Sequence, residues 1–232
     1  MMKSDGSHYI TVAGRRLPLI AKKHPRARRL VVRYDARGEC VKLTLPRYVS
    51  LKSAVEFAES KAGWIEAQMH KHIRTVFENG ADIPLFGETM KLVHIGGRGV
   101  VRCEENTLYI SGNSEFLERR VRDYIKQETK KIIITRAEHY AEAAGVTFRG
   151  VSLRDSSSRW GSCSAKGALS FCWRLAFAPL SVLDYVVCHE VAHLRHHNHS
   201  AAYWKLVEQL CPNYATHERW LKNHGQSVWG WG

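Results

Sequence analysis

The feature that most constrains this chain is the segment SVLDYVVCHEVAHLRHHNHS at residues 181–200. Its apolar first half predicts a buried helix. His189 and His193 are four residues apart, so both imidazoles project from one face of that helix and can bind a single zinc ion. Glu190 follows the first of them and can act as a general base on water held by the metal. The HExxH pattern therefore indicates a zinc-dependent hydrolase.

The third ligand is predicted to be His199, which follows His193 by six residues. This is the ligand spacing of the metzincin pattern H-E-x-x-H-x-x-G-x-x-H. No methionine follows Met90, however, so the sequence lacks the methionine turn of a true metzincin. A carboxylate on a later helix, from Glu208 or Glu218, is the alternative third ligand. A closed structural zinc site is the alternative to a catalytic one.

Three further residues are candidates for contact with substrate. Arg159 and Tyr203 can donate to a developing oxyanion, which catalysis requires besides the metal. Trp160 lies beside Arg159 in the segment RWGSCS, whose glycine and serines suit a close approach of other groups. Packing in the core is the alternative role for Trp160 and for Tyr203.

Hydrophobic periodicity divides the chain into a strand-rich part followed by a helical one. Strands are predicted over residues 15–23, 27–35, 40–46, 90–95, 99–103, 107–111, 148–155 and 168–175. Helices are predicted from about 51 to 74, with Ser50 as N-cap, and from about 114 to 144, ending at Gly145. The segment at 156–167 is expected to be a loop, and two C-terminal helices are expected to be separated at Pro212.

The change from strand to helix patterning places a domain boundary near residues 112–114. We therefore expect a β-rich N-terminal domain with one helix at residues 1–112 and a catalytic domain at residues 113–232. The order of elements is that of an α+β protein rather than of a regular βαβ series.

The chain is strongly basic, with 35 Lys+Arg against 22 Asp+Glu. Eight basic residues and no acidic residue lie within residues 15–33. Such a stripe can attract the phosphates of a nucleic acid or a nucleotide, and a solvated strand face is the alternative interpretation.

Neither a membrane span nor a secretory signal is expected, because no apolar stretch approaches the roughly 18 residues that a spanning helix needs. The six cysteines are scattered and contain no CxxC pair, which favours reduced thiols. We therefore expect a cytoplasmic protein.

Taken together, several motifs resemble the YgjP-like metallopeptidase family, whose members are related to WLM and SprT-like zincins. The resemblance is carried by RWGSCS at residues 159–164, by the segment at 178–194 that contains HEVAH, and by NHSAAYW at 198–204. N-terminal segments are also similar. The resemblance implies a zincin-like domain in which the HExxH helix packs on a small sheet. It further implies zinc at His189, His193 and His199, with Glu190 as the catalytic base.

The leading hypothesis is a zinc metallopeptidase that hydrolyses peptide bonds of a peptide or protein substrate. A strand at 168–175 or the RWGSC loop could pair with the extended substrate, as in zincins generally. Two alternatives are a metal-dependent nucleoside triphosphate pyrophosphatase-type hydrolase, and a SprT-like protease recruited to DNA by the basic stripe. The first alternative uses the same metal for phosphorus chemistry.

Overall fold

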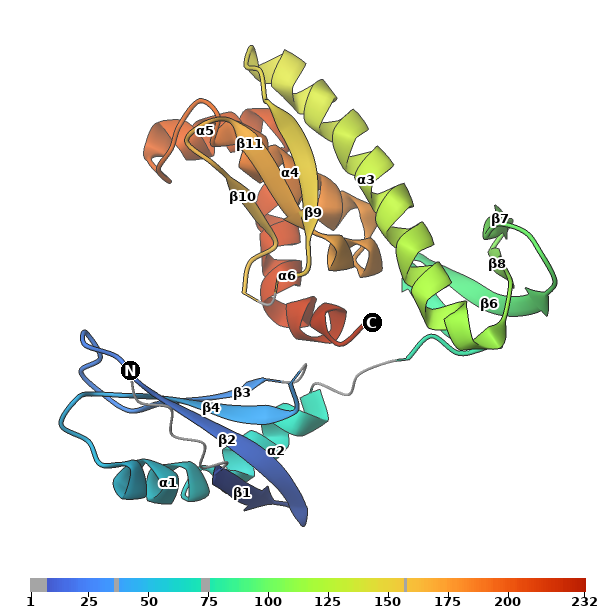
Figure 1. Cartoon of the computed structure of the whole chain (residues 1–232). Coiled ribbons are helices and arrows are strands. Elements are labelled where there is room, and N and C mark those ends of the chain that lie inside the picture. The colour runs from blue at the N-terminus through green and yellow to red at the C-terminus, as the bar shows by residue number, and fades with distance from the viewer. Residues whose placement is uncertain (1–7, 36–37, 72–75, 157) are drawn as a thin grey trace. The chain divides into compact units, whose positions relative to one another are not determined.

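The structure is a computed structural model that describes residues 8–35, 38–71, 76–156 and 158–232 (Figure 1). It is an α+β protein, as the sequence predicted. The chain forms two compact units, Met1–Arg74 and Thr75–Gly232. No described helix has the length and apolar character needed to cross a membrane.

The first unit contains a four-stranded sheet in the order β1-β2-β4-β3, in which β2 and β4 are parallel and the other pairs antiparallel. Its strands are β1 (His8–Val12), β2 (Arg15–Lys23), β3 (Val31–Asp35) and β4 (Cys40–Leu45). Alternate residues such as Leu17, Leu19 and Leu43 are buried in an apolar core that includes Ala54, Ala58 and Ile65 of the two helices. The other residues of each strand face solvent, as alternation requires.

The helix expected over residues 51–74 is two helices, α1 (Leu51–Glu59) and α2 (Ala62–Lys71). Ser50 caps α1 as predicted, because its side chain accepts a hydrogen bond from the Ser53 N–H. The break follows from Ser60, whose hydroxyl donates to the Phe57 carbonyl oxygen at 2.7 Å and competes with helix continuation. The predicted end at 72–74 lies outside the described residues.

The second unit begins with a four-stranded sheet in the order β5-β6-β8-β7. Its strands are β5 (Asp82–Leu85), β6 (Glu88–Gly96), β7 (Arg102–Glu104) and β8 (Thr107–Ser111). Leu117, Val121 and Ile125 of the following helix pack into the same core as Leu92 and Ile110 of this sheet. This sheet and helix therefore belong to one compact unit, and the chain divides between residues 74 and 75, whereas the change in patterning places a boundary near residues 112–114.

Helix α3 (Leu117–Ala144) extends through both halves of the second unit. It follows a 3-10 turn, η1 (Ser114–Phe116), and ends as predicted at Gly145, which is left-handed with φ 63°. Its N-terminal part packs on the β5–β8 sheet, and its C-terminal part contributes Ile133, Ala137 and Tyr140 to the core around the next sheet.

A three-stranded sheet in the order β10-β11-β9 forms the base of the candidate site (Figure 1). It consists of β9 (Gly150–Arg154), β10 (Gly161–Cys163) and β11 (Ala168–Cys172). Strand β10 lies within the segment 156–167 that was predicted to be a loop. Strand β11 ends at Cys172 rather than at 175, and Trp173–Phe177 forms a 3-10 turn, η2. Within that turn Arg174 and its neighbours are buried.

Helix α4 (Leu180–Ala192) packs against β10 and α3, and α5 (Ala201–Leu210) and α6 (Tyr214–Trp229) follow it (Figure 1). The break between α5 and α6 falls around Pro212, as predicted. Most of α4 is buried, so it carries apolar residues on nearly every side. A polar side chain on this helix is therefore held in a fixed and largely dry environment.

The end of the chain is anchored by Arg174, which is only 2% exposed. Its guanidinium group donates to the backbone oxygens of Trp231 at 2.6 Å and Gly232 at 2.5 Å, and it also pairs with Asp155. The indole of Trp231 stacks on Phe177, with 5.2 Å between ring centroids. These contacts explain the Trp-Gly-Trp-Gly sequence, for which sequence patterns gave no account.

Candidate metal centre

Helix α4 and the turn after it bring three histidines together. His189 and His193 lie one turn apart, with ring centroids separated by 5.1 Å. Helix α4 ends at Ala192, and the chain turns back so that His199 arrives immediately before Ser200, the N-cap of α5. One nitrogen from each imidazole lies within 4.8 Å of the corresponding nitrogens of the other two.

The geometry of these nitrogens fits a zinc ion. The Nε2 atoms of His189 and His199 are 3.2 Å apart. A tetrahedral ion with Zn–N bonds of about 2.0–2.1 Å places its ligands roughly 3.3 Å from one another. In His193, Nδ1 lies 3.0 Å from the carbonyl oxygen of His196, which can only accept a hydrogen bond, so Nδ1 carries the proton. Its Nε2 lone pair is then directed to the other two rings.

The environment favours the neutral form of the two helix histidines, His189 and His193, which is the form that binds metals. Burial, together with the smaller effects of the neighbouring His193 and His199, lowers the pKa of His189 to about 4. Burial also lowers the pKa of His193, although a hydrogen bond with His196 opposes this effect. His189 and His193 therefore present a free nitrogen lone pair to a cation at neutral pH.

Glu190 lies on α4 beneath strand β10 and is 6% exposed. It packs so closely on Gly161 that a methyl group at position 161 would come within 2.5 Å of its Oε1 atom. Burial raises the pKa of Glu190 to about 7, while Arg159 and a hydrogen bond from the Cys163 backbone lower it. A carboxyl group with this pKa can both accept and release a proton near neutral pH.

The other predicted site residues have different surroundings. Arg159 is exposed and acts electrostatically on Glu190. Tyr203 is fully buried, stacks on His193 at 4.6 Å between ring centroids, and donates its hydroxyl to the His189 carbonyl oxygen at 3.1 Å. Tyr203 therefore contacts both helix histidines, through the ring of His193 and the backbone of His189. The alternative third ligand Glu218 forms an ion pair with Lys222 on α6.

Trp160 is held by the last helix. Its indole stacks on Trp229 with 3.9 Å between ring centroids, and Gly225 packs against its other atoms, since a methyl group there would lie 3.1 Å from Cζ2. Helix α6 thus fixes the residue between Arg159 and Gly161. The glycine in RWGSCS predicts a close approach of other groups. Nothing in the sequence identifies Glu190 as the neighbour of Gly161, or Trp229 as the stacking partner of Trp160.

Three histidines that could hold a metal ion therefore lie on the same helix and turn as one buried glutamate. A family model described as YgjP-like, metallopeptidase domain, matches residues 28–224. The chain belongs to this family, as its motifs predicted. The crystal structure of the metallopeptidase zymogen of Pyrococcus abyssi abylysin is 22% identical, with a TM-score of 0.36. The match covers 39% of this chain and 93% of that chain. A comparison with curated proteins gave no match.

Proposed function

We propose that the protein is a zinc-dependent metallopeptidase with His189, His193 and His199 as ligands and Glu190 as general base. The observation that carries the proposal is the convergence of three imidazoles on a helix and turn that also carry one buried carboxyl group with a raised pKa. Zinc is favoured over magnesium or calcium because all three candidate ligands are imidazole nitrogens. When bound, it supplies Lewis acidity that polarises the scissile carbonyl group and makes water more acidic.

The protein residues supply the proton transfers and the charge balance. Glu190 accepts a proton from the attacking water and returns it to the leaving amine, as its pKa near 7 permits. Arg159 stands close enough to Glu190 to lower its pKa, so its positive charge can oppose negative charge that develops on the substrate. Tyr203 holds the backbone of His189 and acts as a positioning residue.

Strand β10 is the expected place for the substrate backbone. Among the described strands it pairs only with β11, so an extended peptide could pair with its other edge, where the Cys163 backbone already meets Glu190. Because Gly161 of β10 contacts Glu190, a peptide paired with this edge passes beside the proton-transferring group. We also place the protein in the cytoplasm, since all six cysteines are free thiols.

The test compares the zinc-loaded protein with its Glu190→Gln variant on a mixed peptide library and on a panel of nucleoside triphosphates. We expect the wild type alone to cleave peptides, with a loss of about 10²–10⁴-fold in rate for the variant. Both proteins should retain close to one zinc. Phosphate or pyrophosphate release by the wild type, without peptide cleavage, would replace the peptidase by a phosphoanhydride hydrolase.

A second candidate function concerns recruitment to nucleic acid by the first unit. The solvent face of its sheet carries basic residues on adjacent strands: Arg33 of β3 lies opposite Lys42 of β4, and Lys22 of β2 lies opposite Thr44, two residues further along β4. The side chains of Arg33 and Lys22 are exposed, which suits contact with a phosphate backbone. DNA affinity should fall steeply with added salt, and Lys22→Gln and Arg33→Gln should each reduce the salt slope by about one. Indifference to DNA at low salt would remove this function.

A further inference from the structure

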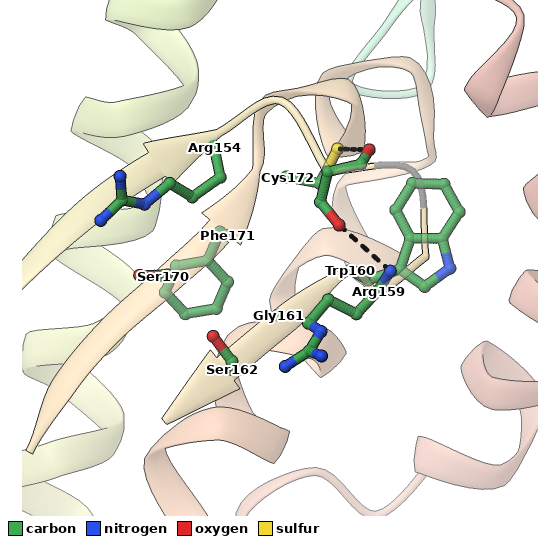
Figure 2. A pocket seen from close by; sticks show the side chains of 9 residues that line it. Arg154, Arg159, Trp160, Gly161, Ser162, Ser170, Phe171 and Cys172 are labelled. Atoms are coloured by element: carbon green, nitrogen blue, oxygen red, sulfur yellow. Dashed lines mark hydrogen bonds between the residues drawn. The ribbon is translucent and has the colours of Figure 1, made fainter. Parts of the chain in front are cut away.

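A pocket of about 180 Å³ lies on the β9–β11–β10 sheet, and Gly161, which packs on Glu190, is one of its lining residues (Figure 2). Figure 2 shows Arg154 extending from the end of β9 and Arg159 from the segment before β10. Serine side chains and the aromatic ring of Phe171 complete much of the lining. The serines are Ser156, Ser162 and Ser170.

The residues that line the pocket carry a net positive charge, because they include two arginines and no described acidic residue. The nearest acidic neighbour in sequence, Asp155, is engaged by the buried Arg174. Glu190 acts on Arg159 but is itself buried against Gly161. Arg154 and Arg159 therefore remain available for an anion from outside, and guanidinium groups bind carboxylates with two parallel hydrogen bonds.

We propose that this pocket binds the carboxylate of an aspartate or glutamate side chain of the substrate. The protein then prefers acidic residues close to the scissile bond. The inference rests on the proposed peptidase function and names a substrate class for it. A volume of 180 Å³ is below the roughly 300–1,000 Å³ of pockets for drug-sized ligands, which favours one side chain over a nucleoside triphosphate.

The position of the pocket relates it to the reaction. Gly161 both lines the pocket and contacts Glu190, so the anion site and the general base share one residue of β10. An extended peptide advances about 3.3 Å per residue, with side chains directed alternately to opposite faces. A side chain in the pocket therefore belongs to a residue within one or two positions of the bond that is cleaved.

The experiment uses matched peptides that carry glutamate or glutamine at each position around the scissile bond. For the zinc-loaded wild type we expect kcat/KM to be roughly ten-fold or more higher with glutamate at one position, as charge-assisted hydrogen bonds allow. Arg154→Gln should bring this ratio close to one, and Arg154→Lys should retain part of it. Arg149→Gln is the matched control, an exposed arginine immediately before β9, and should leave the ratio unchanged.

A binding measurement separates failure of this inference from failure of the peptidase function. Calorimetric titration of the Glu190→Gln variant with the two peptides should show tighter binding of the glutamate peptide, and Arg154→Gln should abolish the difference. If no peptide is cleaved but this difference persists, the peptidase proposal fails and the anion pocket stands. Equal binding and equal kcat/KM for the two peptides at all positions would overturn the pocket assignment, as would a nucleoside triphosphate that alone depends on Arg154.

Discussion

The two compact units differ in what they bury. The core of the first unit consists of apolar side chains from its sheet and two helices. Every buried polar or charged side chain among the described residues lies in the second unit: Ser111, Thr129, Arg174 and Glu190. Burying a charged group costs several kcal/mol unless partners compensate it. The second unit contains two such groups, Arg174 and Glu190, so its interior depends on specific partners for buried charges.

The difference also separates two kinds of charge. The basic residues of the first unit lie at the surface, where charge attracts a partner without defining it. Arg174 and Glu190 of the second unit are buried, and each contacts defined neighbours. Arg174 anchors the C-terminal segment, and Glu190 stands against Gly161 beside the histidines. Substitutions that remove these contacts should reduce stability or activity far more than substitutions of exposed charged residues in the first unit.

The largest effect is expected for His199→Ala. With one of three nitrogens removed, zinc affinity should fall by at least about a hundred-fold, because two helix histidines alone leave the ion undercoordinated. Competition with a chelator measures this affinity, and the thermal stabilisation by zinc should diminish with it. The control is His224→Ala, an exposed histidine on α6. Unchanged zinc retention in His199→Ala would point to a different third ligand.

The second largest effect is expected for Arg174→Met. The variant leaves the backbone oxygens of Trp231 and Gly232 without their donors, so unfolding should become easier by about 2–4 kcal/mol. Urea denaturation followed by tryptophan fluorescence measures it, since Trp64 alone of the seven tryptophans lies outside the second unit.

The matched control is Arg29→Met, which alters an exposed arginine of the first unit and should stay within about 0.5 kcal/mol of the wild type. Hydrogen exchange should also accelerate at the C-terminal end of α6 in Arg174→Met alone. Equal stability of the two variants would mean that anchoring of the C-terminal segment does not support the second unit.

Much of this architecture could be predicted because it depends on local patterns. Alternation identified β2, β3 and β4, and the helical period identified α3 and its end at Gly145. The spacing of His189, His193 and His199 predicted their convergence, since one helix and one turn contain all three. In each case the determining residues lie within a few turns or one strand of one another.

The remaining features depend on contacts between distant residues. Strand β10 has three residues, too few for periodicity to reveal it, and it exists because it pairs with β11. The chain divides into units at a different place from the predicted one, because Leu117 and Val121 of α3 complete the core of the preceding sheet. The neighbours of Gly161 and Trp160 come from α4 and α6, and a single sequence contains no signal for such pairs.

A smaller effect is expected for Gly161→Ala. The added methyl group would meet the Oε1, Cγ and Cδ atoms of Glu190 at 2.5–2.8 Å, so the carboxyl group must move. We expect a loss of about 1–2 kcal/mol in stability and a fall of ten-fold or more in kcat, with little change in zinc content. Gly150→Ala is the control in the same sheet, because a methyl group there meets no atom within 4 Å. Equal kcat in both variants would show that the position of Glu190 is not critical.

The smallest effect is expected for Tyr140→Phe, which tests how α4 is held by α3. The Tyr140 hydroxyl donates to Asp184 Oδ2 at 2.8 Å, and Arg136 lies 3.3 Å from the other carboxylate oxygen. Removing the hydroxyl leaves Asp184 paired with Arg136, so the loss should be about 1–2 kcal/mol at pH 8. Urea denaturation of both proteins between pH 8 and pH 11 measures it.

The stability difference between wild type and Tyr140→Phe should depend on pH. Burial, and then the hydrogen bond and charge of Asp184, raise the pKa of Tyr140 in the folded protein. The unfolded chain releases the tyrosine proton near pH 10, whereas the folded protein retains it, so rising pH favours unfolding of the wild type. The contribution of Tyr140 is complete below about pH 10 and is lost as pH rises above that value. The stability difference between wild type and Tyr140→Phe should therefore shrink at alkaline pH. A constant difference up to pH 11 would mean that neither burial nor Asp184 holds the proton on the Tyr140 hydroxyl, and that the Arg136–Asp184 ion pair and apolar packing join α3 to the helix of the metal centre.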